Sequence, residues 1–337
     1  MLYLTRHDLE HLLAIKEVID VVREAFVELS TGKPAPCMPV RTALEGLPRE
    51  GTPLFMPVYS PRLERFAVKV VSVFPRNFDL GLPTINSLIL LFDAITGKPL
   101  AIMEGSYITA LRTGAASAVA TDTLARRDAE ILSIIGAGVQ GRAQLRCIVH
   151  VRRISEVRVY DALPGNAERF VEEMTPFLQS APIKRGAPPV LRSTRTAEEA
   201  VEGADIIVTA TTSKVPVLEW DWIKPGAHIN AIGAFKPDMR ELDSKTIANA
   251  DKVIVDSRAA IMKEAGDLLI PLEEGTITEE RIDAELGEVL SGLVRGRDTN
   301  GAITVFKTVG VALLDLAVAD LVSRKATSSG VGTEVTL

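Results

Sequence analysis

Three glycines near the middle of the chain have the spacing of a loop that binds a dinucleotide. Gly136, Gly138 and Gly141 follow an apolar, strand-like run at 131–135 and precede a helix-compatible segment at 142–149. In such a loop the first glycine permits a tight turn, the second lets the backbone approach a pyrophosphate, and the third lets the helix pack against the strand. The amino end of the helix offers unpaired N–H groups to the phosphates. The pattern therefore predicts a dinucleotide site.

An acidic residue completes this pattern. Asp161 lies 20 residues beyond Gly141, at the end of a second strand-like run at 157–161. Its carboxylate can accept hydrogen bonds from both ribose hydroxyls and repels a 2′-phosphate, and no arginine stands at Ala162 or Leu163 to bind that phosphate. The sequence therefore predicts NAD(H) as the cofactor, with NADP(H) as the alternative.

Three cations could bind a substrate carboxylate. Arg41 lies in a proline-flanked extended segment, Lys69 lies within an apolar strand, and Arg112 lies in a helix of small residues. A guanidinium binds a carboxylate through two parallel hydrogen bonds, and a desolvated lysine with a lowered pKa can donate or relay a proton. The alternative for Lys69 is a place on the exposed face of a half-buried strand.

Two further loops follow predicted strands, where ligands bind in open parallel sheets. The segment 209–213 includes Thr211, whose hydroxyl could contact the dinucleotide, although a plain polar loop explains it equally well. The segment 230–242 includes Asp238, which could instead cap a helix that starts there.

The elements that must position these residues alternate between strand and helix from about residue 128 onward. Strands are predicted at 131–135, 156–160, 205–210, 228–232 and 252–255. Helices lie between most of them, which is typical of a doubly wound parallel sheet. The last long helix is predicted at 302–324, with no strand after it, and we expect it to return to the first domain.

The part of the chain before residue 125 has a different pattern. Helices are predicted at 8–31 and 106–125, and strands at 65–74, 87–93 and 99–103, while 33–60 is rich in proline and glycine with short extended pieces. Because no strand–helix–strand alternation occurs here, this part predicts a helix and a meandering β-sheet.

The bulk composition excludes several classes of protein. The net charge of −6 argues against nucleic acid as a partner. The sequence contains no run of about 18 uncharged apolar residues, so no membrane span is predicted. The scattered histidines show no metal-binding spacing, and Cys37 and Cys147 are interpreted as reduced thiols. The first ten residues are charged early and lack a signal-peptide core. These features predict a cytoplasmic protein without a metal ion.

Six stretches of the chain resemble the ornithine cyclodeaminase/μ-crystallin family. They occur in family order and cover nearly the whole chain: Lys69 in its apolar strand, 109–117, 134–141, 229–233, 237–241 and 304–310. The resemblance implies an α/β fold in which a Rossmann-type doubly wound parallel sheet at 126–302 is inserted into an α+β substrate-binding and dimerisation domain. That second domain is formed by 1–125 and 303–337, and the resemblance also implies a homodimer.

Individual site residues follow from the same resemblance. Arg41, Lys69 and Arg112 match positions that bind the substrate carboxylate, and Thr84 and Thr113 match positions near the cofactor. The expected cofactor-binding set comprises the glycine loop, the acid and the later loops: Gly136, Gly138, Val139, Gln140, Gly141, Asp161, Thr84, Arg112, Thr113, Thr211, Ile232 and Lys307.

Two departures from the family pattern narrow the implied activity. Phe235 occupies a position where cyclodeaminases and the archaeal type of alanine dehydrogenase carry an aspartate, and Leu54 occupies a position where cyclodeaminases carry a glutamate. Both acids expected to manage a diamine are therefore missing, and together with Met56 the pocket is expected to be apolar. The segment 237–241 is similar to the ketimine-reductase and crystallin branch.

The resemblance thus implies an oxidoreductase that acts on C–N bonds of a small imino or keto acid. The expected reaction is NAD(P)H-dependent reduction of a ketimine carboxylate, Δ1-pyrroline-2-carboxylate or Δ1-piperideine-2-carboxylate, to the L-amino acid. The alternatives are an NAD-dependent L-alanine dehydrogenase, an ornithine cyclodeaminase, and a non-enzymatic ligand-binding protein of crystallin type.

Overall fold

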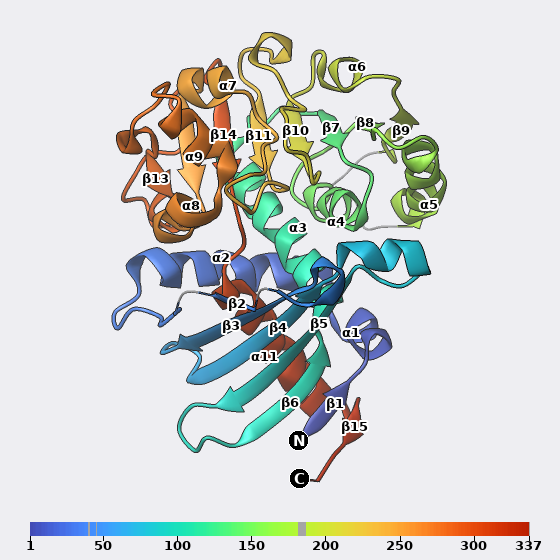
Figure 1. Ribbon diagram of the computed structural model, residues 1–337, viewed down its shortest axis with the longest axis vertical. Coiled ribbons are helices and arrows are strands. Elements are labelled where there is room, and N and C mark those ends of the chain that lie inside the picture. Colours follow the sequence, from blue (N-terminus) through green and yellow to red (C-terminus); the bar gives the residue numbers. More distant parts are fainter. Residues whose placement is uncertain (40, 45, 181–186, 337) are drawn as a thin grey trace. The chain divides into compact units, whose positions relative to one another are not determined.

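The computed structural model describes residues 1–39, 41–44, 46–180 and 187–336, and the chain forms two compact units (Figure 1). Unit 1 consists of Met1–Arg112 and Val311–Leu337, and unit 2 consists of Thr113–Gly310. The division falls inside helix α3 (Gly105–Leu124) at one end and after Gly310 at the other.

Unit 2 is built on an eight-stranded sheet in which every pairing is parallel. Its strands in spatial order are β13 (Ala284–Glu285), β12 (Lys252–Val255), β14 (Thr304–Lys307), β11 (His228–Ala231), β10 (Ile206–Thr209), β7 (Ile131–Ile135), β8 (Glu156–Tyr160) and β9 (Val190–Ser193). The predicted doubly wound parallel sheet is confirmed, and each of its five predicted strands is present within a residue or two.

Helices cover both faces of this sheet because the strands are apolar on both sides. On β10, Ile206 and Val208 enter the hydrophobic cluster on one face, and Ile207 enters the cluster on the other face. The helices of unit 2 after α3 are α4 (Val139–Ile148), α5 (Asn166–Ser180), α6 (Ala197–Val201), α7 (Ser244–Asn249), α8 (Arg258–Glu264), α9 (Gly266–Glu273) and α10 (Leu286–Leu290), with short 3₁₀ turns at Trp220–Trp222 and Glu279–Arg281.

The predicted final helix at 302–324 is wrong at its amino end. Thr304–Lys307 forms strand β14 in the interior of the sheet, where all four residues are buried, and helix α11 begins only at Ala312. Threonine, valine and phenylalanine favour a strand buried on both faces, and Gly310 turns the chain with a positive φ of 83° before the helix. A short strand, β15 (Thr333–Glu334), also follows the helix, contrary to the prediction.

Unit 1 contains a seven-stranded sheet that is antiparallel except for the pairing of β1 with β6. Its strands in spatial order are β15, β1 (Leu2–Leu4), β6 (Pro99–Glu104), β5 (Ile85–Asp93), β4 (Arg65–Val73), β3 (Thr52–Ser60) and β2 (Thr42–Ala43). Helix α11 (Ala312–Ser329) packs against strands β3 to β6 and against helix α2. The predicted combination of helix and meandering sheet is confirmed.

Two details of unit 1 differ from the sequence prediction. The helix expected at 8–31 is split into α1 (Arg6–Leu12) and α2 (Ile15–Thr31), because the backbone is extended at Leu13 and Ala14. The first helix begins earlier than expected because Thr5 caps it. The proline-rich segment contains the nine-residue strand β3, which tolerates its prolines because β2 pairs with it only around Leu54 and Phe55.

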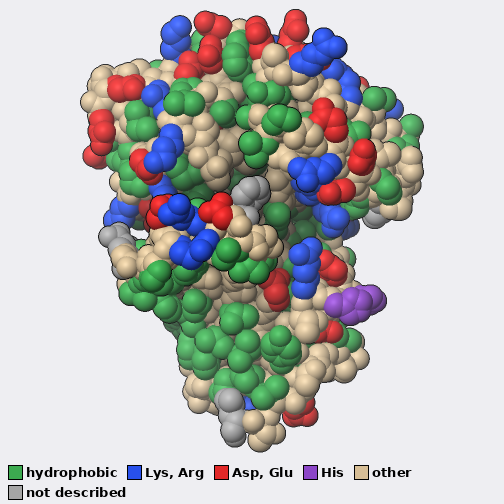
Figure 2. All heavy atoms as spheres, turned by 45° about the vertical axis from the view of Figure 1, so that its right-hand side comes forward, with side chains coloured by type: hydrophobic (Ala, Val, Ile, Leu, Met, Phe, Trp, Pro, Cys, Tyr) green, Lys and Arg blue, Asp and Glu red, His purple; other side chains and the backbone are tan. Residues whose placement is uncertain are grey.

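The two faces of the unit 1 sheet differ in burial. Alternate residues such as Met56, Ile89 and Met103 are buried on the face that carries α11. The opposite face, which we call the open face, is apolar as well and consists of Phe55, Pro57, Tyr59, Phe66, Val68, Val70, Leu88, Leu90, Phe92 and Ile102. None of these open-face residues is fully buried, and Phe66 and Phe92 stack with ring centroids 4.7 Å apart. Figure 2 shows hydrophobic side chains gathered in the lower part of the view.

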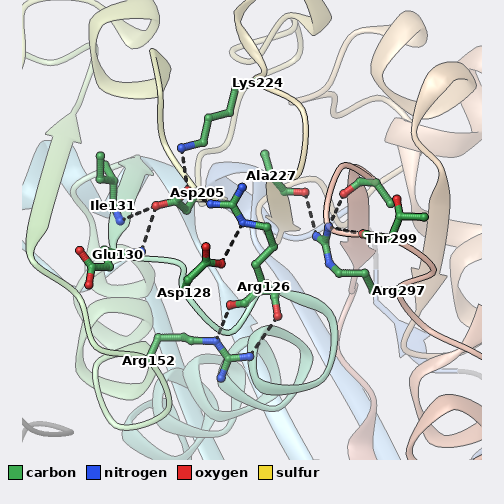
Figure 3. A network of polar contacts seen from close by, with 12 residues as sticks. Arg126, Asp128, Glu130, Ile131, Arg152, Asp205, Lys224, Ala227, Arg297 and Thr299 are labelled. Carbon is green, nitrogen blue, oxygen red and sulfur yellow. Dashed lines mark hydrogen bonds and ion pairs between the residues drawn. The ribbon is translucent and has the colours of Figure 1, made fainter.

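A polar network lies at the end of the unit 2 sheet that is remote from the glycine loop (Figure 3). Asp205 accepts hydrogen bonds from the backbone N–H groups of Glu130 and Ile131 and forms ion pairs with Arg126 (2.8 Å) and Lys224 (2.6 Å). The buried Arg152 donates to carbonyls at the carboxyl end of α3 and thereby satisfies groups that the helix leaves unpaired. The network therefore stabilises the unit 2 fold, and we assign it no catalytic or ligand-binding role.

Acid should destabilise unit 2 through His228. This residue is fully buried on β11, with Nδ1 2.9 Å from Oγ1 of Thr304, and burial together with the charge of Arg297 lowers its pKa to about 3. Between pH 6.5 and about 3 the unfolded chain binds a proton that the folded chain does not, so the free energy of unfolding falls as pH falls, by up to about 1.4 kcal/mol per pH unit.

Chemical denaturation between pH 7 and 4 measures this effect. A His228→Gln variant should lose stability less steeply than the wild type, whereas exchange of the exposed His7 for glutamine should leave the slope unchanged. Equal slopes for wild type and His228→Gln would show that the buried imidazole does not couple to folding.

Candidate functional site

The glycine loop lies at the point where the unit 2 sheet reverses its winding order. Strands β7 and β10 are neighbours, and the chain continues from β7 to β8 on one side and from β10 to β11 on the other. Ligands of doubly wound sheets bind at such a switch point, at the carboxyl ends of the strands. Gly136 follows β7 with a positive φ of 107°, and a side chain there would meet the carbonyl oxygen of Ala210 beyond β10.

The other two glycines differ in what surrounds them. A Cβ at Gly141 would collide with the carbonyl oxygen of Gly136, so this residue lets α4 approach the loop. A Cβ at Gly138 would have no atom within 4 Å, so the chain itself does not require a glycine there. Gly138 is the N-cap of α4 and provides no side-chain cap, and Val139 is 71% exposed at the first position of the helix. The open backbone at this helix start has the form that a pyrophosphate requires.

Asp161 is held beside this loop by hydrogen bonds. It follows β8, and its Oδ2 accepts from the backbone N–H of Ala137 at 2.8 Å, while Oδ1 accepts from the N–H of Leu163 and the side chain of Asn166. The carboxylate is half-buried and fixed, and it lies where the acid of a dinucleotide-binding strand–loop–helix unit binds ribose. The residues of unit 2 therefore fit NAD.

Later loops of unit 2 meet at two buried acids that the sequence analysis did not select. The carboxylate of Glu241 accepts hydrogen bonds from the N–H and hydroxyl of Thr211 (2.6 and 2.8 Å) and from the N–H of Gly233 (2.7 Å). Burial, and secondly the nearby Asp267, raise the pKa of Glu241. Glu241 is the last residue of the segment 237–241 that resembles the family, and this place in the sequence could have identified it as a candidate site residue.

Asp267 connects this pair of loops to β14. It accepts hydrogen bonds from the N–H groups of Glu241 and Leu242 and forms a 2.7 Å ion pair with Lys307, whose side chain is fully buried. Ile232, next to Gly233, is also buried. Thr211 and Lys307 thus point toward carboxylates of the protein in this structure.

Asp238 does not cap a helix. Its exposed carboxylate forms a 2.7 Å ion pair with Lys214, which lowers the pKa of Asp238. The next helix, α7, begins at Ser244 and is capped by Asp243, which accepts a hydrogen bond from the N–H of Thr246. The helix start expected within 230–242 is therefore wrong.

Unit 1 contains a second candidate site of its own, a cluster of buried charges. Lys69 on β4 is 2% exposed and lies on the face of the sheet that α11 covers, so the alternative of an exposed strand position is wrong. Its Nζ lies 2.6 Å from Oδ2 of Asp315 on α11, and Nε of Arg112 on α3 lies 3.0 Å from Oδ1 of the same carboxylate. Asp315 was not selected from the sequence.

Electrostatics single out Lys69 within this cluster. Burial, together with the charges of Arg112 and Arg41 and against the opposing effect of Asp315, lowers the pKa of Lys69 to about 8. Arg41 is half-buried in the segment just before β2, so all three predicted cations act in one place. Lys69 and Arg112 share the one carboxylate of Asp315, and two cations placed side by side suit a substrate carboxylate.

The two threonines predicted near the cofactor belong to different units. Thr84 is half-buried directly before β5, and its carbonyl oxygen accepts a hydrogen bond from the N–H of Phe74. Thr113 is buried within α3 and is the first residue of unit 2. Phe235, one of the two departures from the cyclodeaminase pattern, packs against the hydrophobic core of unit 2.

Comparison with known proteins identifies the family. The model of the ornithine cyclodeaminase/mu-crystallin family matches residues 1–330. The chain belongs to this family. A Δ1-pyrroline-2-carboxylate reductase of the family from Bacillus cereus is 41% identical over 335 residues, covering 99% of both chains.

Two solved structures are similar to the chain along its whole length. A Δ1-pyrroline-2-carboxylate reductase from Thermococcus litoralis, in complex with NADH and L-proline, is 47% identical with a TM-score of 0.93 and covers 99% of this chain and 100% of its own. An archaeal alanine dehydrogenase dimer with bound NAD is 35% identical with a TM-score of 0.90 and covers 100% and 99%. Both the family and the fold expected from the sequence are confirmed.

No group of three or more His, Cys, Asp or Glu side chains in the described segments is arranged to hold a metal ion. Among the described helices, none combines the length and apolar character needed to cross a membrane.

Proposed function

We propose that this chain is an NADH-dependent reductase of a cyclic ketimine carboxylate. The substrate is Δ1-pyrroline-2-carboxylate, or its six-membered homologue Δ1-piperideine-2-carboxylate, and the product is the L-amino acid. The observation that carries this proposal is the similarity over the full chain to a reductase whose structure contains NADH and L-proline. The missing acids at Phe235 and Leu54 support a substrate without a second amine.

Unit 2 binds the cofactor in this proposal. NADH supplies the hydride that reduces the C=N carbon when it is bound. Gly136, Gly138 and Gly141 hold its pyrophosphate, and Asp161 accepts hydrogen bonds from a ribose, which favours NADH over NADPH. The remaining residues assigned to cofactor contact are Val139, Gln140, Thr84, Arg112, Thr113, Thr211 and Ile232. Because Lys307 is buried on Asp267, we assign it a positioning role in the loops of this site.

The charge cluster of unit 1 binds the substrate in this proposal. Arg41 and Arg112 hold the carboxylate, which fixes the neighbouring C=N carbon for hydride transfer. Lys69 holds the substrate and keeps the imine nitrogen protonated, and a protonated imine has a more electrophilic carbon. The proton that Lys69 secures would remain on nitrogen when the carbon is reduced, and the product would be the secondary amine. Lys69 suits this work because its pKa of about 8 lies near neutral pH.

Initial rates with four substrates test the proposal against its alternatives. We expect NADH oxidation with one or both cyclic imines to exceed the rate with pyruvate and ammonia. Faster turnover of pyruvate and ammonia would make the protein an alanine dehydrogenase, and release of ammonia from ornithine without net change in the cofactor would make it a cyclodeaminase. Bound NADH without turnover of any substrate would favour a ligand-binding protein.

The open face of unit 1 supports a homodimer. Its residues form apolar rows across neighbouring strands, such as Pro57, Val68 and Leu90, and a contiguous exposed apolar patch marks a protein–protein contact. We therefore assign substrate binding and dimerisation to unit 1 and dinucleotide binding to unit 2. Cys37 and Cys147 are not joined in a disulfide, which supports the cytoplasm as the location.

A charge on the open face should separate the dimer. Leu88 is 51% exposed on β5, so a Leu88→Lys variant can fold as a monomer but would bury a lysine in the dimer. Light scattering after size exclusion should give the mass of two chains for the wild type and of one for Leu88→Lys. Ile95→Lys, at the turn after β5, is the matched control and should remain dimeric. A dimeric Leu88→Lys variant would place the interface elsewhere.

A further inference from the structure

Asp315 has a place in the site that neither the family resemblance nor the proposed reaction assigned. It lies on α11, 2% exposed, with each carboxylate oxygen bound to a different cation. Oδ2 accepts from Nζ of Lys69 at 2.6 Å, and Oδ1 accepts from Nε of Arg112 at 3.0 Å. One carboxylate from the last helix therefore fixes a lysine from the sheet and an arginine from α3.

We propose that Asp315 is a positioning residue of the reductase: it keeps Lys69 protonated and holds Lys69 and Arg112 in the arrangement that binds the substrate carboxylate. This inference rests on the proposed function. Asp315 acts through the two cations and forms no bond to the reacting atoms.

The charges around Lys69 explain why it needs this partner. Burial acts against a charged lysine, and two guanidinium groups, Arg112 from α3 and Arg41 from the segment before β2, act in the same direction. Across the sheet, the register neighbours of Lys69 are the uncharged Met56 on β3 and Ile89 on β5. Asp315 from α11 supplies the opposing negative charge, and with it the pKa of Lys69 is about 8.

Removal of the Asp315 charge should change the pKa of Lys69 in one direction, downward. An asparagine at 315 keeps the size of the side chain but removes the carboxylate that favours the ammonium form. The pKa of Lys69 should then fall by about 1–3 units, the usual effect of a close opposite charge. The variant should reduce imines well at low pH and lose activity earlier than the wild type as pH rises.

The same helix provides a matched control. Asp320 lies five residues further along α11, is also buried, and binds Arg65 (3.4 Å) and Arg324 (2.9 Å), outside the charge cluster. Asp320→Asn therefore makes the same chemical change on the same helix without touching Lys69. Asp315→Glu keeps the charge and should restore the pH profile in part.

The first test is the pH profile of kcat/KM for Δ1-pyrroline-2-carboxylate with NADH. The alkaline limb, near pH 8 in the wild type and in Asp320→Asn, should move about 1–3 units lower in Asp315→Asn, with activity recovering at low pH. A limb at the wild-type pH, with activity reduced by the same factor at every pH, would overturn the proposal and leave Asp315 a structural residue.

The second test needs no catalytic activity, so it separates this inference from the proposed function. At pH values between the lowered pKa of Lys69 in the variant and about 8, the folded variant has lost a proton that its unfolded chain keeps. The free energy of unfolding of the variant therefore rises with pH relative to that of the wild type. The difference in Tm between wild type and Asp315→Asn should narrow from pH 6 to pH 8. A difference that stays constant, as expected for Asp320→Asn, would overturn the role of Asp315, whereas narrowing in a protein that reduces no imine would contradict only the proposed function.

Discussion

Replacement of Lys69 by methionine is expected to lower kcat/KM for imine reduction by about 100-fold or more and to leave NADH binding unchanged. The buried ammonium of Lys69 has a pKa of about 8, and loss of a positioned proton donor usually costs about 10²–10⁴ in rate. Methionine fills the buried position without a charge. Steady-state rates and a fluorescence titration with NADH measure the two quantities.

Lys98 supplies the control for this variant. It is exposed in the turn before β6, so Lys98→Met removes one positive charge from unit 1 outside the cluster and should keep wild-type rates. Turnover of Lys69→Met within a few-fold of the wild type would remove Lys69 from the reaction. Loss of NADH binding together with turnover would instead show that the lysine acts on the cofactor.

Replacement of Gly138 by alanine should weaken NADH binding by roughly 10- to 100-fold without loss of stability. The φ of −79° suits alanine, and the added methyl group meets no atom of the protein, so the fold does not resist the change. A methyl group placed against a pyrophosphate overpacks the site, and overpacking costs about 1–3 kcal/mol. The Kd for NADH and the Tm of the free protein report binding and folding separately.

Gly301 is a suitable control in the same unit. A Cβ there also meets no atom within 4 Å and the backbone does not require a positive φ, so Gly301→Ala should change neither the Kd nor the Tm. An unchanged Kd in Gly138→Ala would mean that the pyrophosphate does not approach this loop.

Local patterns were sufficient to predict the scaffold of unit 2. The apolar run 131–135, the three glycines and the acid at Asp161 are close together in sequence, and each has a backbone or hydrogen-bond role that its residue type reveals. Strand β14 was assigned to a helix because all four of its residues, Thr304 and Lys307 included, are buried, so its sequence lacks the two-residue alternation that distinguishes a strand from a helix.

The acids of the candidate site could not be predicted in the same way. Asp315 lies 246 residues from Lys69 and 203 from Arg112, and the helix around it reads as a continuous apolar element. Asp267 and Glu241 likewise bind partners in other elements. A buried carboxylate is recognised by the cation or N–H groups that face it, and only the tertiary structure brings those groups together.

In the proposed reaction a hydride passes from NADH to the imine carbon beside the carboxylate, and an isotope label can follow this transfer. The protein would be incubated with Δ1-pyrroline-2-carboxylate and NADH that carries deuterium at the transferable position, and the product would be examined by mass spectrometry and NMR. We predict L-proline with one deuterium on its Cα. Proline without deuterium at Cα, or consumption of neither reactant while NADH remains bound, would show that the protein does not catalyse this reduction.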